Sequence, residues 1–196
     1  MQNKEWKGNK HSVFVTLGAS NHSSDERQPD DYYATEPLAT RLLLAEEKFN
    51  KKILEPACGE GHMSKELISA GYEVTSFDKV NRGYGDEEDF FCRDAWDGDI
   101  ITNPPYKCAL DFVQHALEIV PEGSKVAFFL KIQFLEGKVR RKFFNVNPPR
   151  KIFVASSRLL CAKNGDFQNY PSSALCYAWF VWEKGFKGDP IIKWIN

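Results

Sequence analysis

Short apolar runs alternate with amphipathic segments along most of this chain. In the amphipathic segments, apolar residues recur every three or four positions, as they do on one face of an α-helix; Leu110, Val113 and Leu117 are an example. The run at 125–130 is apolar through its middle, which is typical of a strand buried on both faces. The pattern predicts seven strands, at residues 51–55, 73–78, 89–93, 99–102, 125–130, 151–155 and 174–182, and helices at residues 35–47, 62–70, 107–120 and 138–144.

Strands that alternate with helices favour a parallel sheet, because each parallel connection has to cross the sheet and a helix usually does so. The sequence therefore predicts an α/β fold with a doubly wound, mostly parallel seven-stranded sheet and helices on both faces. In such folds, ligands bind beyond the carboxyl ends of the strands. Two of these ends carry candidate chemistry, since Gly59 and Gly61 follow the first strand and Asn103 follows the fourth.

Residues 1–29 are polar, with one apolar run at residues 13–17. This segment fits a flexible tail, a small edge strand or a flap over the site, and the sequence does not choose among them. We expect the domain itself to span residues 30–196. Its first helix signal is Thr35, a good N-cap ahead of Glu36 and Pro37.

The length of 196 residues suits one domain with a sizeable core, and no window approaches the roughly 18 apolar residues of a membrane helix. The N-terminus lacks the apolar core of a signal peptide. The five cysteines are scattered, without a CxxC pair. We therefore expect reduced thiols, a cytoplasmic protein with no membrane partner, and no zinc or other metal site.

The net charge of −1 hides a strong asymmetry along the sequence. Ten lysines and arginines lie between Lys125 and Lys163, against the single acid Glu136, which is a local balance of +9. Such a balance fits a face that binds phosphates. It equally fits an ordinary solvated basic surface.

The fourth predicted strand stops abruptly at Asn103-Pro104-Pro105-Tyr106. The two prolines fix φ and supply no N–H group, so Asn103 is held on a rigid loop beyond the strand end. Its amide, the nearby carbonyls and the flat ring of Tyr106 suit the recognition of a planar group that carries an amino group. An ordinary turn with a packed tyrosine fits the tetrapeptide alone equally well.

Gly59 and Gly61 allow a tight strand-to-helix turn that a ligand can approach closely. Asp78 ends the next strand, 17 residues after Gly61, where a carboxylate can bind two ribose hydroxyls. A nicotinamide dinucleotide site would carry a third glycine where this chain has Ser64, so a cofactor without a pyrophosphate is favoured. Asp94 ends the third predicted strand, and it either accepts a hydrogen bond from an adenine amino group or is a surface acid.

The order of these motifs resembles that of class I, Rossmann-like S-adenosylmethionine-dependent methyltransferases. Within that class, the chain is similar to the N6-adenine DNA methyltransferases of bacteria and phages. The resemblance covers roughly residues 30–182 and is carried by residues 55–61, Asp78, Asp94 and residues 103–106. The stretch from Asp31 to Pro37 resembles the family's N-terminal motif, Asp-aromatic-aromatic-x-Thr-Pro, but inserts Glu36 before the proline.

The resemblance implies S-adenosyl-L-methionine as the cofactor and DNA as the partner. It implies cofactor binding by Tyr33, Thr35, Glu55, Pro56, Ala57, Cys58, Gly59, Gly61, Asp78, Lys79, Asp94, Ala95 and Asn103. Glu55 and the glycine turn would face the methionine portion, Asp78 the ribose and Asp94 the adenine. The implied catalytic residues are Asn103, Pro104, Pro105 and Tyr106. Substrate contacts are expected from Tyr106, Lys138, Arg140, Arg141 and Lys163.

An exocyclic amino nitrogen is a poor nucleophile, because its lone pair is delocalised into the ring. The resemblance implies that Asn103 Oδ1 and the Pro104 carbonyl accept its two hydrogens, which makes the nitrogen more tetrahedral. Catalysis would then consist of orientation and charge stabilisation, without a covalent enzyme intermediate. The target base would leave its stack to reach the pocket and would lie against the ring of Tyr106.

Several alternatives remain open. The same tetrapeptide occurs in enzymes that methylate a glutamine amide in release factors, although these usually carry an N-terminal helical domain and a different glycine motif. RNA adenine methylation is a further alternative, N4-cytosine methylation is less favoured, and an inactive nucleic-acid-binding homologue is the non-enzymatic one. Because little of the chain after Tyr106 is left for target recognition, we expect short-site specificity, or recognition supplied by a partner subunit or a homodimer.

Overall fold

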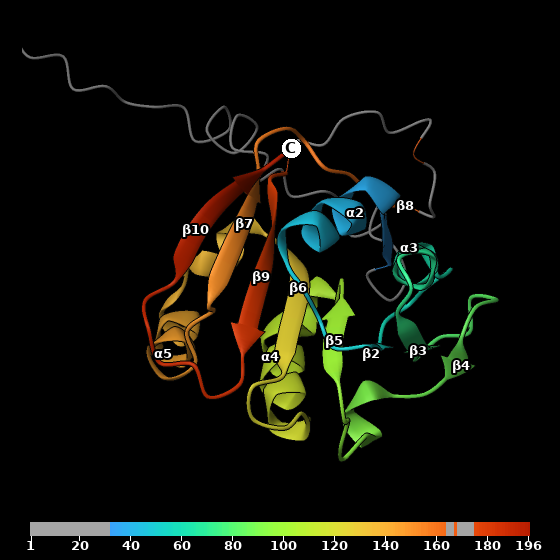
Figure 1. Cartoon of the computed structure of the whole chain (residues 1–196), viewed down its shortest axis with the longest axis horizontal. Helices are drawn as coiled ribbons and strands as arrows, with labels where there is room; N and C mark the ends of the chain where they lie inside the picture. The colour runs from blue at the N-terminus through green and yellow to red at the C-terminus, as the bar shows by residue number, and fades with distance from the viewer. Residues whose placement is uncertain (1–31, 164–166, 168–174) are drawn as a thin grey trace, which may run out of the picture.

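The structure is a computed structural model that describes residues 32–163, 167 and 175–196. The predicted N-terminal segment, residues 1–29, lies outside the described part. Figure 1 shows a twisted central sheet with helices packed against it. The predicted α/β class is confirmed, with a large, mostly parallel sheet flanked by helices. None of the described helices is long and apolar enough to cross a membrane.

Eight strands form the main sheet, in the order β10-β7-β9-β6-β5-β2-β3-β4. Their bounds are β2 Lys52–Glu55, β3 Glu73–Asp78, β4 Asp86–Glu87, β5 Asp99–Thr102, β6 Lys125–Lys131, β7 Lys151–Ala155, β9 Tyr177–Glu183 and β10 Ile191–Ile195. β9 runs antiparallel to its neighbours β6 and β7, and all other pairs are parallel. A separate two-stranded sheet pairs β1 (Tyr33–Thr35) antiparallel with β8 (Cys161–Lys163).

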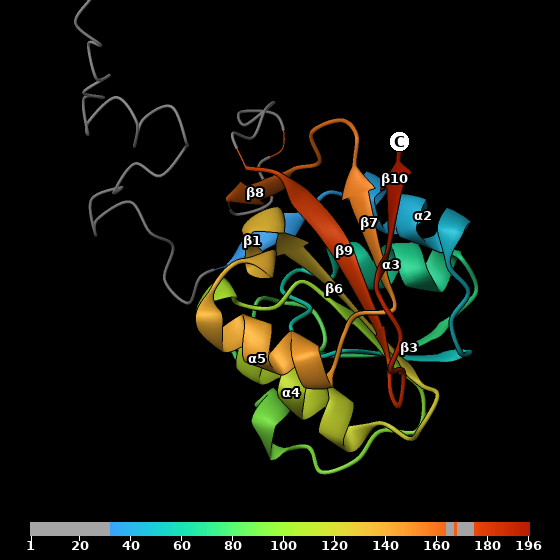
Figure 2. The ribbon, with the colours of Figure 1, turned by 90° about the vertical axis from the view of Figure 1, so that its left-hand side faces the viewer.

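Helices cover both faces of the main sheet (Figure 2). One face carries α2 (Pro37–Glu46) and α3 (His62–Ser69), and the other carries α4 (Ala109–Ile119) and α5 (Lys138–Val146). The 3₁₀ helices are η3 Phe90–Cys92, η4 Tyr106–Cys108 and η5 Ile132–Leu135. β6 is apolar throughout its middle because it serves both cores. Val126 and Phe128 pack with α4 and α5, whereas Ala127 and Phe129 pack with α2 and α3.

The main sheet has one strand more than the seven predicted. The predicted strand at residues 89–93 is wrong, because the Asp89 side chain accepts a hydrogen bond from Phe91 N at 3.1 Å and caps η3. The short strand β4 pairs with β3 instead. The prediction also missed β10, which follows a charged loop and completes the opposite edge of the sheet by pairing with β7.

Thr35 is not the N-cap of the first described helix, so this prediction is wrong as well. The cap is Glu36, whose extended backbone continues the direction of β1, and the helix begins at Pro37. Thr35 is the last residue of β1 and pairs with Cys161 of β8. Its hydroxyl therefore faces the end of β5 rather than the first turn of the helix.

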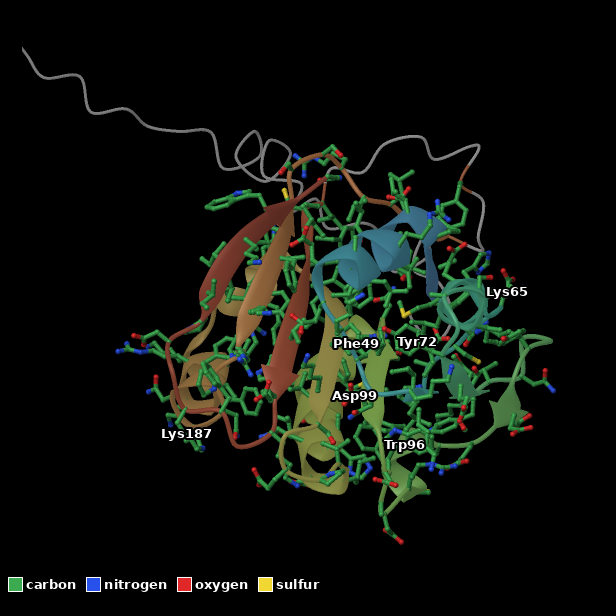
Figure 3. The ribbon with its side chains drawn as sticks, viewed as in Figure 1. Phe49, Lys65, Tyr72, Trp96, Asp99 and Lys187 are labelled. Atoms are coloured by element: carbon green, nitrogen blue, oxygen red, sulfur yellow. The ribbon has the colours of Figure 1, made fainter. Side chains whose placement is uncertain are left out.

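A buried carboxylate links the amino-terminal ends of neighbouring strands of the main sheet. Asp99 starts β5, is 1% exposed and accepts hydrogen bonds from Asn50 N at 2.6 Å, Asn50 Nδ2 at 2.8 Å and Lys125 N at 2.8 Å. Trp96 Nε1 donates to the Asp99 carbonyl at 3.0 Å, and the two residues lie together at the lower end of the sheet in Figure 3. These bonds tie the start of β5 to the segments that lead into β2 and β6.

Glu47, at the end of α2, forms a second buried polar contact at the amino-terminal ends of the strands. Its carboxylate is 7% exposed and pairs with Lys125 Nζ at 2.5 Å and Lys151 Nζ at 2.6 Å. Burial opposes the ionisation of Glu47, but the two ammonium groups outweigh it and hold its pKa below the usual value. The pair joins α2 to the first residues of β6 and β7.

Replacement of Glu47 by glutamine is expected to lower the free energy of unfolding by about 2–4 kcal/mol at neutral pH, because two half-buried ammonium groups lose their counterion. The deficit should shrink as the pH falls below about 4, since a depressed folded-state pKa stabilises the protein only while the carboxyl is ionised. Urea denaturation over a pH series measures both effects.

The neighbouring Glu46→Gln variant is the control. Among the described residues, Glu46 forms an ion pair only with Lys193, at 3.8 Å, and both side chains are more than two-fifths exposed. We expect a change below about 0.5 kcal/mol for such a surface pair. Equal deficits in the two variants would contradict the role given to Glu47.

Candidate active site

A cavity of about 470 Å³ opens at the carboxyl ends of β2, β3 and β5. Ligands of this class of fold usually bind at the carboxyl ends of the strands, so the cavity lies where a ligand site is predicted. The predicted residues that line it are Tyr33, Thr35, Glu55, Ala57, Cys58, Asp78, Lys79, Asn103, Pro104, Pro105 and Tyr106. The fold thus brings β1 and the ends of three neighbouring strands together around one cavity.

The side-chain amide of Asn103 is held by two hydrogen bonds to β1 and by a longer one to Cys161 Sγ, at 3.8 Å. Nδ2 donates to the Tyr33 carbonyl at 3.1 Å and to Thr35 Oγ1 at 2.9 Å. A backbone carbonyl only accepts, so the NH₂ end of the amide must face β1. The opposite end, Oδ1, is buried and has no hydrogen-bond partner among the described residues. A buried acceptor without a partner costs about 1–3 kcal/mol, which is tolerated where a ligand supplies the donor.

Glu36, the residue inserted into the predicted N-terminal motif, supports this arrangement. Glu36 N donates to the Leu160 carbonyl at 3.1 Å, and its side chain accepts from Leu160 N at 2.6 Å. These bonds extend the pairing of β1 with β8 by one residue. The insertion therefore leaves the contact of Thr35 with Asn103 in place.

Tyr106 lies in η4 and is held on several sides. Its hydroxyl donates to Cys161 Sγ at 3.3 Å, and its ring stacks on Tyr33 with a centroid separation of 6.2 Å. Burial raises the pKa of the Cys161 thiol to about 11 and raises the pKa of Tyr106 well above its usual value, so both groups are neutral at physiological pH. Lys131 Nζ lies over the Tyr106 ring, 4.3 Å from its centroid.

The glycine turn wraps closely around other side chains. Gly59 has a φ of +54°, and a Cβ there would lie 2.2 Å from the Tyr32 ring. Gly59 N donates to Asp78 Oδ2 at 2.9 Å, and Val80 N donates to Asp78 Oδ1 at 3.0 Å. Each carboxylate oxygen keeps room for a further donor. Pro56, Gly59 and Gly61 shape the turn, although they do not line the cavity themselves.

Glu55 is a buried carboxyl at the floor of the cavity, with 2% of its surface exposed. Burial raises its pKa to about 8, and the nearby charge of Asp78 adds to the effect. Ser64 Oγ donates to Glu55 and lies 2.6 Å from Ser76 Oγ. Glu55 therefore holds a proton at neutral pH, and a cation bound in the cavity would favour its ionised form.

Besides Pro56, Gly59 and Gly61, six predicted site residues do not line this cavity. Asp94 and Ala95 are exposed beyond η3, away from the lining, since the strand expected to end at Asp94 does not form. Lys138, Arg140 and Arg141 lie on α5; Lys138 and Arg141 border a second groove of about 390 Å³. Lys163 lies in β8, and its side chain is outside the described part of the structure.

Several residues near the site were not predicted, among them Tyr32, Arg82 and Lys131. Tyr32 and Arg82 both line the cavity, and the Arg82 guanidinium lies 4.4 Å from the centroid of the Tyr32 ring. Lys131 lies over Tyr106. Tyr32 precedes Tyr33 in the N-terminal motif and Lys131 directly follows the strand predicted at residues 125–130, so the sequence around both residues carried a signal. Arg82 lies in a polar loop, and the sequence around it gave no signal of a site. Across the described residues, no cluster of three or more His, Cys, Asp or Glu is arranged to hold a metal ion.

Comparison with known proteins finds solved structures with a similar fold. No protein-family model and no curated protein sequence matches this chain. Among solved structures, a candidate RNA methyltransferase from Pyrococcus horikoshii is similar, with a TM-score of 0.58 and 13% identity over 91% of this chain and 100% of that one. A candidate class I S-adenosylmethionine-dependent methyltransferase from Listeria monocytogenes gives a TM-score of 0.56 and 13% identity, covering 94% of this chain and 72% of that one.

A modification subunit of a candidate type I restriction enzyme from Vibrio vulnificus has a TM-score of 0.55 and 12% identity; the match covers 92% of this chain and 48% of that subunit. At such low identity these likenesses concern the fold. The chain therefore shares the Rossmann-like α/β fold of these methyltransferase neighbours, which confirms the predicted fold class.

Because the pKa of Glu55 is raised, we predict that this residue lowers the free energy of unfolding by an amount that depends on pH. Between the ordinary glutamate pKa and about pH 8, folded Glu55 keeps a proton that the unfolded chain releases, so its contribution to stability falls as the pH rises. The slope is at most about 1.4 kcal/mol per pH unit. Glu55→Gln should flatten the stability profile over this window in urea denaturation. An unchanged profile would contradict the raised pKa.

Proposed function

We propose that this chain transfers a methyl group from S-adenosyl-L-methionine to an exocyclic amino group, namely N6 of adenine in DNA. The observation that carries the proposal is the amide of Asn103. Its nitrogen is anchored to Tyr33 and Thr35, while Oδ1, buried at the edge of the cavity, has no hydrogen-bond partner among the described residues. An acceptor that is held in place and unsatisfied suits a ligand that brings an N–H donor.

The proposed role of this acceptor follows from the chemistry of an aromatic amino group. Asn103 Oδ1 and the Pro104 carbonyl would each accept one hydrogen of that group, so that its nitrogen is held in one orientation. Both oxygens are dipoles that stabilise the positive charge that develops on the nitrogen during transfer. Because Pro105 lacks an N–H group and the chain there is rigid, the two acceptors need little reorganisation.

The residues of the cavity fit the cofactor. The cavity volume of about 470 Å³ is in the range of small-molecule sites. Glu55 would face the amino group of its methionine portion, and Asp78, which has unused acceptor capacity, its ribose. When bound, the cofactor supplies the methyl group as an electrophile. Since Asp94 and Ala95 lie away from the cavity, we assign the adenine portion to Lys79 and Val80, which line it.

The basic surface supports a nucleic acid as the substrate. Lys138, Arg140 and Arg141 belong to α5, which carries four cations and no acid in its nine residues. These side chains would contact phosphates and hold the strand, without reading its sequence. Lys163, at the end of β8, is proposed for the same task. In the proposed methyltransferase domain, residues 30–196, Tyr106 would lie against the target base.

Target recognition is proposed to be limited in this chain. The described residues after Tyr106 belong to the sheet, its helices and their connections, and none of them forms a separate recognition domain. We therefore propose recognition of a short site, or recognition shared with a partner subunit or a second copy of the chain. A nuclease footprint of a monomer on a long defined site would contradict this proposal.

The proposed reaction is tested with radiolabelled S-adenosyl-L-methionine and separate pools of duplex DNA, single-stranded DNA, RNA and a translation release factor. The expected result is label in DNA that is recovered as N6-methyladenine. Asn103→Ala should lower the rate by about 100-fold or more, because the reacting group loses a preorganised partner. Gln114→Ala, which removes an exposed amide from α4, is the matched control and should keep the wild-type rate.

Other outcomes of this assay point elsewhere. Label only in RNA, or only as methylglutamine in the release factor, would replace the DNA assignment with one of the alternatives. An Asn103→Ala variant that is folded, binds cofactor and keeps the wild-type rate would contradict the role of the amide.

A further inference from the structure

The loop that follows β3 folds back over the glycine turn. It spans residues 79–85, between the end of β3 and the start of β4. Its Tyr84 ring packs so closely on Gly61 that a Cβ there would lie 2.4 Å from the ring. The Cys58 thiol donates to the Tyr84 carbonyl at 3.5 Å. The loop therefore lies beside the part of the cavity that is assigned to the methionine portion of the cofactor.

Arg82, in the middle of this loop, lies over the turn through an aromatic ring. The Tyr32 ring packs on Gly59, and its hydroxyl oxygen accepts a hydrogen bond from Glu60 N at 3.3 Å. The Arg82 guanidinium lies 4.4 Å from the centroid of that ring, and Arg82 and Tyr32 both line the cavity. The ring thus holds a positive charge at the wall of the cavity, next to the glycine turn.

Arg82 has a donor that the described structure leaves unpaired. Its Nε atom is buried, and no described residue accepts a hydrogen bond from it. The contact with the Tyr32 ring attracts the positive charge but offers no oxygen to the N–H groups. A buried donor at the wall of a cavity points to a ligand that brings an acceptor.

A second arginine of this chain shows which acceptor completes such an arrangement. The Arg93 guanidinium lies over the Phe77 ring, 5.1 Å from its centroid. Its Nε and Nη2 donate to the two carboxylate oxygens of Glu88, at 2.9 and 2.6 Å. Arg82 has the same contact with a ring, but among the described residues no carboxylate takes the place of Glu88 at its Nε.

The amino-acid group of the cofactor carries the missing carboxylate. The methionine portion of S-adenosyl-L-methionine has one ammonium and one carboxylate, and the proposed function places Glu55 at the ammonium. The carboxylate is then left without a partner. Arg82 lies beside the glycine turn, to which the methionine portion is assigned, and a planar guanidinium binds a carboxylate through two parallel hydrogen bonds.

The other basic residues of the cavity lining are placed less well for this carboxylate. Lys79 Nζ pairs with Asp89 at 2.7 Å, and its side chain is mostly exposed. Burial lowers the pKa of His62, so its imidazole is neutral at physiological pH. Lys107 lies in η4, next to the loop that is assigned to the substrate. The comparison therefore favours Arg82.

We propose that Arg82 binds the carboxylate of the methionine portion of S-adenosyl-L-methionine, and that Tyr32 positions its guanidinium. The carboxylate accepts a hydrogen bond from Nε, the donor that has no partner in the described structure. Glu55 and Arg82 then bind the two charged groups of the amino-acid portion from different sides. This inference rests on the proposed function, since it names a further residue for the cofactor of that reaction.

The test uses Arg82→Met, which keeps an unbranched apolar side chain beside Tyr32 and removes the charge. Isothermal titration calorimetry without any substrate gives the Kd of S-adenosyl-L-methionine and of its decarboxylated form, which keeps the sulfonium and the amino group. The Kd of S-adenosyl-L-methionine should rise about 10-fold or more, because a charged hydrogen-bonded pair is lost. The Kd of the decarboxylated form should stay at its wild-type value, because that ligand has no carboxylate for Arg82 to bind.

The difference between the two ligands is the signature of this role, since a merely structural defect would weaken both. Arg150→Met is the matched control. Arg150 also lies over an aromatic ring, that of Phe186 at 5.8 Å, and pairs with Glu183, but it directly precedes β7 at the amino-terminal ends of the strands. Its replacement should leave both Kd values unchanged.

Three results would overturn the inference. Equal weakening of both ligands by Arg82→Met would assign Arg82 a structural role. An unchanged Kd of S-adenosyl-L-methionine, with weaker binding of a single-stranded oligonucleotide, would make a substrate phosphate the anion that Arg82 binds, and the proposed function would stand. Failure of the wild-type protein to bind S-adenosyl-L-methionine at all would overturn the proposed function together with the inference.

Discussion

The two hydrogen bonds from Asn103 Nδ2 to β1 determine which end of the amide faces the cavity, and the proposed chemistry depends on that choice. With the amide turned over, its NH₂ group would meet the amino group of the substrate, and two donors would face each other. The Tyr33 carbonyl and Thr35 hydroxyl prevent this. β1 can supply them because it pairs with β8, more than 120 residues away in the sequence.

Buried polar groups have different surroundings at the amino-terminal and carboxyl-terminal ends of the strands. At the amino-terminal edge, Asp99 and Glu47 are buried with several partners each, and they hold strands and a helix together. At the carboxyl edge, Asn103 Oδ1 has no partner in the described structure and burial raises the pKa of Glu55 to about 8. The polar groups that stabilise the fold thus lie at the amino-terminal ends of the strands. The groups to which a ligand could bind lie at the carboxyl-terminal ends.

Local sequence signals identified much of this arrangement. β6 was found because its apolar middle is buried on both faces, and Asp78 and Asn103, which line the cavity, were singled out because each lies at a strand end. Asp94 was assigned to the site on the strength of a strand that Asp89 prevents by capping η3. The pairing of β1 with β8 and the place of Lys131 over Tyr106 arise from long-range contacts, which periodicity and spacing do not encode. The roles of the assembled residues stay predictions.

The orientation of the Asn103 amide can be measured directly by nuclear magnetic resonance of ¹⁵N-labelled protein. The side-chain amide signal is identified by its loss in Asn103→Ala, and its two hydrogens should exchange slowly with solvent because both are hydrogen-bonded. Thr35→Val should accelerate exchange and shift one of them, whereas Thr40→Val, which alters a buried hydroxyl without a hydrogen-bond partner in the described structure, should leave both unchanged. Rapid exchange of both hydrogens in the wild-type protein would contradict the locked amide on which the account rests.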